Sequence, residues 1–371
     1  MSNIPKLRFP EFTDAWEKWE LGKIADIFDN QRVPVAANER ITGTIPYYGA
    51  NGIQDYVDGF THQGEFVLLA EDGANDTKNY PCEYVKGKIW VNNHAHVLSG
   101  KKNLLNNLFL TSRIKSMDIS PYLVGGGRAK LNAKVMLKIK LSIPTLPEQQ
   151  KIGNLFKQLD RLITLHKRKW DDVILLKKAL LQKMFPKNGS DFPEIRFPEF
   201  TDAWEKCKLG DVIIDEIKGK AKADMLGEQS LYLDANYLNG GNELYVNSPT
   251  DVDKNDVIIL WDGSQAGTVY HGFSGALGST FKAFRPKQSG AFLYQQLKRY
   301  QDTIYNSYRT PNIPHVIKSF TKEFNISIPN YEEQQKIGNL FKQLDRLITL
   351  HKRQHEHYQL LKKALLQQMF V

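Results

Sequence analysis

Two stretches of the sequence come close to motifs that bind phosphate or transfer a methyl group, and both are incomplete. The segment Gly263–Thr268 (GSQAGT) has the glycines of a phosphate-binding loop but lacks the lysine that such a loop requires before its serine or threonine. The segment Ile45–Tyr48 (IPYY) is not the Asn/Asp-Pro-Pro-aromatic loop of an amino-methyltransferase. Neither stretch therefore predicts catalysis.

Two groups of metal-binding residue types are also incomplete. His94 and His96 would face one side of a strand and could bind zinc, but no third ligand stands at a suggestive spacing. The triplet 216–218 (EIK), with Asp211 or Asp215 before it, matches a metal-dependent nuclease only over a short stretch. None of these groups occurs twice in a chain that is otherwise duplicated, so we predict no metal site and no catalytic residue.

Hydrogen bonding to base edges is a better-represented chemistry. Asn and Gln pair with adenine and Arg and Lys with guanine in the major groove of DNA, while lysines also reach phosphates. The segments 125–130 (GGGRAK) and 307–318 (SYRTPNIPHVIK) combine such cations with loops shaped by glycine or proline. Each residue alone could equally be an ordinary turn or strand-edge residue. We predict DNA contacts from Tyr47, Asn51, Gln54, Lys78, Asn92, Asn93, His94, Arg128 and Lys130, and from Ser264, Gln265, Lys282, Arg309, Asn312, His315 and Lys318.

The elements that position these residues are predicted to be short strands with one helical patch in each half of the chain. The strand segments are bounded by Gly, Asn and Pro, as turns require. They are 64–74, 87–98 and 137–144, then 255–267 and 320–329, and the helical patches are 104–115 and 291–308.

The sequence contains an internal duplication. RFPEFTDAWEK occupies 8–18 and 196–206, and EQQKIGNLFKQLDRLITLHKR occupies 148–168 and 333–353, letter for letter. The segments between these repeats share almost no identity. The repeated segments therefore form a common scaffold, and the two dissimilar segments between them, roughly 23–146 and 211–331, are called the first and second heads.

The longer repeat predicts a helix of about 38 residues and about 57 Å, because its apolar residues recur every three or four positions. A lone helix of this length cannot hide such a stripe, so we expect the two copies to pack antiparallel as a coiled coil. The alternatives are two ordinary core helices, or a recent duplication that has not yet drifted. The identity of the two copies extends to side chains expected to be exposed, which core packing does not require. We therefore predict that both copies bind the same partner. The predicted partner-binding residues are Lys157, Asp160, Arg161 and Lys167 and their counterparts Lys342, Asp345, Arg346 and Lys352.

Charge is concentrated on these helices. The chain has 50 Lys and Arg against 41 Asp and Glu, a net charge of +9, and segments 148–185 and 333–371 together carry all of the excess. The remainder is +3 over 1–147 and −3 over 186–332. The heads would thus hold nucleic acid by local patches rather than by a diffuse cationic surface. No apolar run is long enough to span a membrane, no signal peptide is evident, and the two cysteines suit a reducing compartment, so we expect a cytoplasmic protein.

With these features together, the sequence resembles the specificity subunits of type I restriction–modification enzymes. The resemblance rests on the opening RFPEFTDAWEK of each half, PYYGANGI (46–53), WVNNHAHVL (90–98), LWDGSQAG (260–267) and SIPTLPEQQKIGNLFKQLD (142–160). It implies a non-catalytic subunit in which each head reads one half of a bipartite double-stranded DNA target. It also implies that the helices dock two methyltransferase subunits, which bind S-adenosylmethionine, while restriction and translocase subunits use ATP and Mg²⁺. No cofactor is expected in this chain.

The expected fold is therefore α+β, with two mixed α/β target recognition domains separated by two long helices in an antiparallel coiled coil. Two other functions stay open: a coiled-coil adaptor with two protein-binding heads, which fits the duplication equally well, and a self-contained DNA-modifying enzyme, which the missing motifs disfavour. The expected boundaries are 1–146 for the first recognition domain, 147–186 for the first helix, 187–207 for the linker with the repeated motif, 208–331 for the second recognition domain and 332–371 for the second helix.

Overall fold

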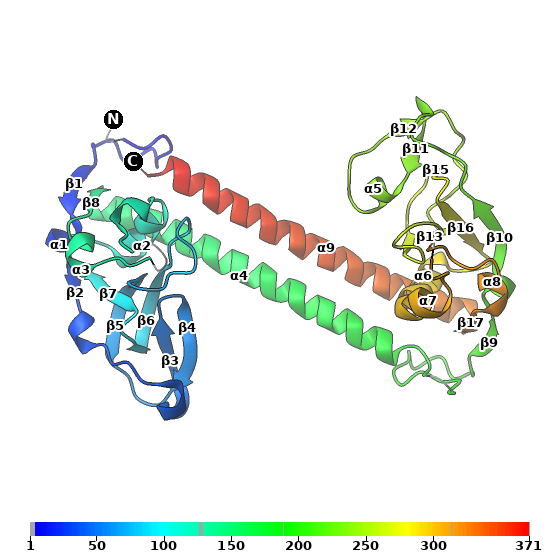
Figure 1. The fold of residues 1–371 in the computed structure, drawn as a ribbon, viewed down its shortest axis with the longest axis horizontal. Coiled ribbons are helices and arrows are strands. Elements are labelled where there is room, and N and C mark those ends of the chain that lie inside the picture. Colours follow the sequence, from blue (N-terminus) through cyan, green and yellow to red (C-terminus); the bar gives the residue numbers. More distant parts are fainter. Residues whose placement is uncertain (1–3, 126–128, 188, 313, 371) are drawn as a thin grey trace. The chain divides into compact units, whose positions relative to one another are not determined.

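The computed structural model divides into two compact units (Figure 1). The first unit is Met1–Lys167 together with Arg353–Val371, and the second is Arg168–Lys352. Each unit holds one head and parts of both long helices. The described residues are 4–125, 129–187, 189–312 and 314–370.

The first head contains a six-stranded sheet in the order β2-β7-β5-β6-β3-β4, with only β3 and β6 parallel. In β5, Val67 and Leu69 belong to the core on one face, while Phe66 and Leu68 belong to the core on the other. A second, two-stranded sheet pairs β1 with β8. The strands are β1 Glu17–Glu20, β2 Ala25–Ile27, β3 Thr42–Gly49, β4 Gly52–Val57, β5 His62–Ala70, β6 Cys82–Val91, β7 Ala95–Gly100 and β8 Lys140–Ile143; the helices are α1 Leu21–Ile24, α2 Asn107–Lys115 and α3 Ala133–Met136, with 3-10 turns η1 Asp29–Gln31, η2 Ala37–Glu39 and η3 Ser120–Tyr122.

One predicted strand of the first head was wrong. The segment 87–98 is two strands, because the chain turns at residues 92–94 between β6 and β7. The side chain of Asn92 accepts a hydrogen bond from the backbone N–H of His94 at 2.8 Å, which closes this turn. As a result His94 lies in the turn and His96 lies on β7, and the two do not share one strand.

The second head is built from three smaller sheets, in the orders β10-β16-β13-β14, β12-β11-β15 and β17-β9. The predicted strand 320–329 begins with a helical turn, and the predicted helix 291–308 is broken at Tyr300. The strands are β9 Glu205–Lys208, β10 Ile213–Lys218, β11 Leu226–Leu233, β12 Tyr245–Val246, β13 Val257–Leu260, β14 Val269–His271, β15 Ala276–Leu277, β16 Phe281–Pro286 and β17 Asn325–Ile328; the helices are α5 Ala235–Leu238, α6 Gly290–Arg299, α7 Gln301–Ser307 and α8 Phe320–Glu323, with the 3-10 turn η4 Leu209–Val212.

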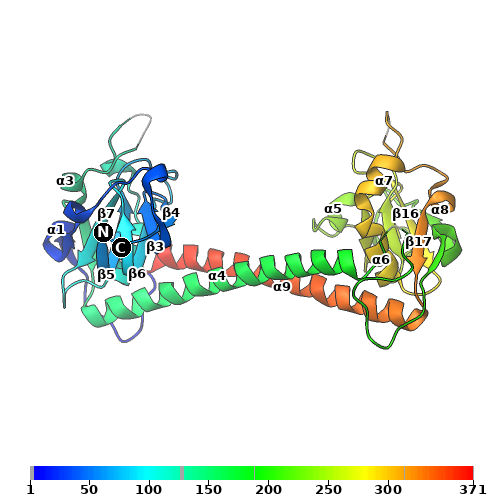
Figure 2. The same cartoon turned by 90° about the horizontal axis from the view of Figure 1, so that it is seen from below.

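The two long helices are α4, Leu146–Lys183, and α9, Tyr331–Gln368, each of 38 residues as predicted. In the first unit the rings of His166 and Tyr358 stack at 5.5 Å, and Lys362 forms an ion pair with Asp160. Residue numbers rise along α4 as they fall along α9, so the helices are antiparallel (Figure 2). The predicted fold class is confirmed.

The second unit repeats the ion pair of the first. Lys177 Nζ of α4 lies 2.6 Å from Asp345 Oδ1 of α9, and these residues are the duplicates of Lys362 and Asp160. The coiled-coil contact is therefore made twice by the same residue types. None of the helices in the described part of the chain combines the length and the apolarity that a bilayer crossing requires.

A buried ion pair joins each repeated opening motif to the start of a long helix. Arg8 donates two hydrogen bonds of 2.7 Å to Glu148, whose carboxylate is almost fully buried. Arg196 makes the same two bonds to Glu333, at 2.8 and 2.7 Å. This bidentate pairing raises the pKa of Arg8. It also explains why an arginine in each opening motif and a glutamate in each helix recur together.

An aromatic side chain at the end of a long helix fills the core of each unit. In the first unit the ring of Phe370 lies 6.1 Å from Trp16, 5.7 Å from Phe109 and 5.7 Å from Phe156. In the second unit the ring of Phe185 lies 5.8 Å from Trp204, 5.6 Å from Phe292 and 5.9 Å from Phe341. We call these two groups the first and second aromatic sockets.

Candidate nucleic-acid interface

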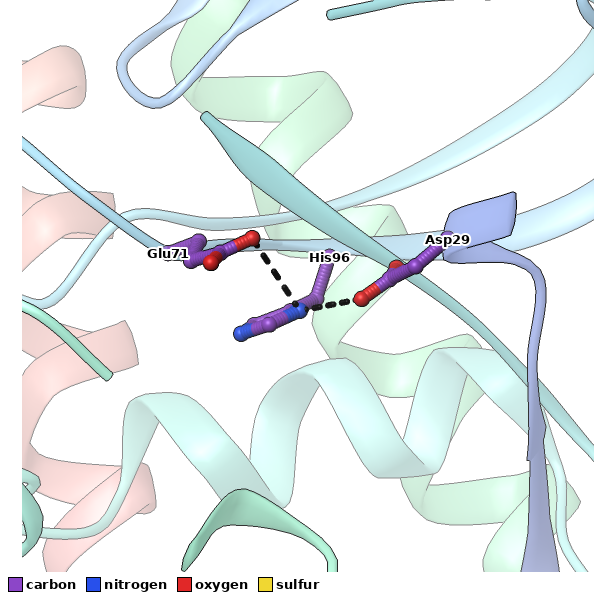
Figure 3. Close-up of side chains that lie close together, drawn as sticks. All are labelled: Asp29, Glu71 and His96. Atoms are coloured by element: carbon purple, nitrogen blue, oxygen red, sulfur yellow. Dashed lines mark hydrogen bonds and ion pairs between the residues drawn. The ribbon is translucent and has the colours of Figure 1, made fainter. Parts of the chain in front are cut away.

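Asp29, Glu71 and His96 lie close together in the first head (Figure 3) and form a network with Arg32. His96 of β7 is fully buried, and its Nδ1 lies 2.6 Å from Asp29 Oδ2 and 3.7 Å from Glu71 Oε2. Arg32 Nη1 donates to Glu71 Oε2 at 2.7 Å, and its Nη2 lies 3.4 Å from Asp29 Oδ2. Two carboxylates are thus held by a guanidinium and an imidazole, largely shielded from water, where such contacts are strengthened.

The residue types of this network could also suggest a metal site. One ligand atom each of Asp29, Glu71 and His96 lies within 4.8 Å of the others. However, Arg32 already pairs with both carboxylates, and Lys130 Nζ lies 3.4 Å from Glu71 Oε1. A metal ion would be repelled by these two cations. The arrangement therefore fits an ion-pair network better than a metal centre.

The network reaches the predicted contact loop of the first head. His96 Nε2 donates to the carbonyl oxygen of Leu131 at 2.8 Å, and the N–H of Leu131 donates to the carbonyl oxygen of Glu71 at 2.7 Å. Val124 and Lys130 exchange two backbone hydrogen bonds of 2.9 Å, which close the loop between them. In Figure 2 the chain on either side of residues 126–128 lies on the face of the head away from α4.

The predicted contact residues of the first head differ in exposure. Tyr47 is only 1% exposed, and its hydroxyl accepts a hydrogen bond from the Val35 N–H at 3.0 Å. Asn51 bridges two loops, donating to the carbonyl oxygen of Gly73 at 2.9 Å and accepting from the N–H of Asn75 at 3.0 Å. Both residues thus have structural contacts. Asn51, Gln54, Lys78 and Asn93 are exposed, His94 and Lys130 are half-buried, Tyr47 and Asn92 are buried, and Arg128 lies outside the described residues.

In the second head, two predicted contact segments meet. The N–H of Gly263 donates to the carbonyl oxygen of Pro314 at 2.9 Å, and the guanidinium of Arg309 donates to the carbonyl oxygen of Ser264 at 3.0 Å. Lys282 Nζ lies 3.6 Å from the centre of the Trp261 ring. The structure therefore brings most of this set to one loop cluster. Ser264, Gln265, Asn312 and Lys318 are exposed, and Lys282, Arg309 and His315 are half-buried.

The residues predicted to bind a partner on the helices fall into two groups. Asp160 and Asp345 are half-buried and engaged in the ion pairs of the coiled coil. Burial lowers the pKa of Lys362, and the nearby Lys115 lowers it further, whereas Asp160 opposes both effects. The cations Lys157, Arg161, Lys167, Lys342, Arg346 and Lys352 are exposed.

The sequence did not lead us to predict that leucines of the long helices are exposed. Leu360 is 68% exposed in the first unit, and its duplicate Leu175 is 67% exposed in the second. The signal was present: 175–185 (LLKKALLQKMF) and 360–370 (LLKKALLQQMF) differ at one position. The antiparallel ion pairs place each such leucine pair, 175–176 or 360–361, opposite further leucines of the other helix. These are Leu347 and Leu350 in the second unit, which are 40% and 45% exposed, and Leu162 and Leu165 in the first.

Comparison with known proteins identifies the class to which this architecture belongs. The crystal structure of the S subunit of a type I restriction–modification system from M. genitalium shares the fold, with a TM-score of 0.75 and 16% identity over 99% of each chain. The family described as the type I restriction modification DNA specificity domain matches twice, at residues 13–175 and 201–357. The chain belongs to this family of specificity subunits.

Curated relatives agree with this assignment. A putative type I restriction enzyme specificity subunit of Haemophilus influenzae is 47% identical over 146 residues, which is 39% of this chain and 38% of that protein. The specificity subunit of the type I restriction enzyme MjaVIII of Methanocaldococcus jannaschii is 30% identical over 202 residues, 52% of this chain and 47% of that protein. The matched segments thus span about half or less of these two relatives' length.

Proposed function

We propose that this chain is the non-catalytic subunit that sets DNA sequence specificity in a type I restriction–modification complex. Each head reads one half of a bipartite double-stranded target, and the helices dock two methyltransferase subunits. S-adenosylmethionine belongs to those partners, and ATP and Mg²⁺ belong to the restriction and translocase subunits. A cytoplasmic location accords with this function.

The observation that carries the proposal is the contrast between identical helices and different heads. The repeat 148–168 is unchanged at 333–353, including exposed cations that make no contribution to the core. The heads differ in sheet order as well as in sequence. Two copies of one partner together with two different half-sites account for both facts.

The loop clusters of the heads support DNA reading. In the first head an exposed amide, Asn93, lies in the turn 92–94, and the half-buried Lys130 lies in a separate segment that is bonded to Glu71. In the second head the exposed amide of Asn312 and the half-buried Arg309 lie in one loop. Such side chains can bond to base edges and phosphates at once. The second head has a net charge of −3 over 186–332, so phosphate contacts there would come largely from the methyltransferase partners.

The leucine groups support docking of the methyltransferase. An exposed apolar group kept in both copies of a repeat is normally covered in the assembled protein. Exposed cations lie on the same helices beside each group, Arg161 and Lys363 in the first unit and Arg346 and Lys178 in the second. The partner would present an apolar helix face with acidic residues at its edges.

A stoichiometry experiment tests the docking. Leu360→Glu and Leu175→Glu should each remove one methyltransferase subunit from the complex, and the double variant should remove both, as measured by native mass spectrometry. The matched control is Ile41→Glu, because Ile41 is 73% exposed but lies in the first head. Two bound subunits in the double variant would contradict this surface.

A methylation map tests DNA reading. Cells that produce the chain with its methyltransferase should acquire methylated adenines at one bipartite sequence, detected by single-molecule sequencing. Arg128→Ala should weaken specific binding by about 1–3 kcal/mol, the usual value of one such contact. Binding of protein partners without any sequence-selective methylation would favour the adaptor alternative.

A further inference from the structure

The buried network of Asp29, Arg32, Glu71 and His96 contains no residue that is predicted to contact DNA. It nevertheless joins the segments that carry the predicted contact residues Asn93 and Lys130. Asp29 also accepts a hydrogen bond from the N–H of Val97 at 2.8 Å, which fixes η1 against β7. Arg32 Nη1 donates to the carbonyl oxygen of Ala95 at 2.8 Å, just after the turn at 92–94. The N–H of Glu71 donates to the carbonyl oxygen of His94 in that same turn, at 2.9 Å. The network therefore holds the turn 92–94 from two sides.

The same network holds the loop that ends at Leu131. Leu131 is fully buried, and its N–H and carbonyl groups bond to Glu71 and His96. The side chain of Glu71 also faces Lys130. The turn 92–94 and the segment Lys130–Leu131 are thus fixed to one another by the backbone of Glu71 and by the side chains of His96 and Glu71.

Two hydrogen bonds hold the His96 ring in this network. A carbonyl oxygen only accepts, so Nε2 must carry a proton to bond to Leu131. At 2.6 Å, Nδ1 and Asp29 Oδ2 must also share a proton, because two acceptors at this distance would repel each other. The charges that face His96 are those of Asp29 and Glu71, with Arg32 and Lys130 beyond them.

We propose that His96, acting with Asp29 and Glu71, is a positioning residue for DNA recognition by the first head. It fixes the position of the turn 92–94 relative to Lys130 and Leu131, so that Asn93 and Lys130 contact the same half-site. His96 is 0% exposed and touches no DNA itself. The inference rests on the function proposed above and adds residues that determine specificity without contact.

Two substitutions of His96 separate its two hydrogen bonds. The amide nitrogen of Gln lies where Nε2 of His does, and that of Asn lies where Nδ1 does. His96→Gln should therefore keep the bond to Leu131 and the register of the loop, whereas His96→Asn should lose it. Both variants disturb the same buried network, so a purely structural role would affect them alike.

A further pair of variants guards against misfolding of the His96 variants. Glu71→Gln removes the charge that faces His96, Arg32 and Lys130 but keeps its backbone bond to Leu131. The matched control is Glu65→Gln, on strand β5, which ends one residue before Glu71; it removes an exposed ion pair with Lys86 of 2.8 Å. Thermal unfolding of all variants would confirm folded heads.

The measurement is selection of methylated sites from a random-sequence DNA library by the complex of full-length chain and methyltransferase. We expect His96→Asn and Glu71→Gln to reduce base discrimination roughly ten-fold or more at one or two positions of the first half-site. Discrimination at the second half-site should not change, and Glu65→Gln should resemble the wild type. His96→Gln, which loses only the bond to Asp29, should lose less discrimination than His96→Asn.

Two results would overturn the proposal. Equal losses for His96→Asn and His96→Gln, or losses spread evenly over both half-sites, would reduce the network to a structural role. Unchanged base preferences in His96→Asn and Glu71→Gln would exclude any role in recognition while leaving the proposed function intact. A wild-type complex that selects no sequence would contradict the proposed function as well.

Discussion

Replacing Phe370 with alanine should destabilise the first unit and leave the second almost unaffected. Phe370 is 9% exposed and packs against three aromatic rings of the first aromatic socket. Truncation of a buried phenylalanine to alanine costs about 3–5 kcal/mol. Slight exposure places Phe370 near the lower end of this range, and Phe185, which is 1% exposed, nearer the upper end.

Hydrogen–deuterium exchange measures the stability of each unit separately, through the exchange rates of its amides. A loss of about 3 kcal/mol corresponds to roughly 100-fold faster exchange of the amides protected by the opening of that unit. Phe370→Ala should produce this change in α2 and β5, and Phe185→Ala should produce it in α6 and β13. Leu360→Ala, at a side chain that is 68% exposed, is the control and should change neither. Equal acceleration in both units with either variant would refute the assignment of one socket to each unit.

Three further predictions address the heads and their junctions. Gly153→Ala should lower the free energy of unfolding by about 1–3 kcal/mol in denaturant titrations, because the new Cβ would lie 2.8 Å from Leu108 Cβ and 2.9 Å from the Phe109 nitrogen; no loss would show that α2 can move. Burial, and after it the charge of Lys342, lowers the pKa of His271 to about 4, so the folded state cannot take up the proton that the unfolded chain binds below about pH 6.5. Stability should therefore fall between about pH 6.5 and 4 by up to roughly 3 kcal/mol in pH-dependent unfolding, and a slope as steep in His271→Phe would exclude this group. Replacing residues 23–146 with the head of another specificity subunit should change one half-site of the methylation map, and a change in both would contradict independent heads.

The sequence predicted the helices and the class of fold because their signals are local or repeated. An apolar stripe over 38 residues and a letter-for-letter repeat leave few alternatives for α4 and α9. The ion pairs of Asp160 and Asp345 were not predicted, because their lysine partners lie on the other helix. Pairing across a coiled coil depends on register, which the stripe alone does not specify.

The contact residues of the heads were harder to predict for a physical reason. Asn and Tyr are equally suited to base contacts and to closing turns, and Asn92 does the second by bonding to the His94 N–H. Asp29 and Glu71 could not be identified at all, since they stand alone in sequence and meet His96 only in the folded sheet. Folding, rather than local pattern, brings these three together.

The first aromatic socket also sets the order in which the protein can finish folding on the ribosome. Trp16 and Phe370 are in contact although about 350 residues separate them in the chain. All of the residues of the second unit, 168–352, leave the ribosome before Phe370 does, so the second unit can close its core while the first still lacks its final ring. The half that is translated first is thus the half that is completed last. Until then Trp16 and its neighbours lack the ring that covers them, and transiently exposed apolar surface of this kind is prone to aggregation.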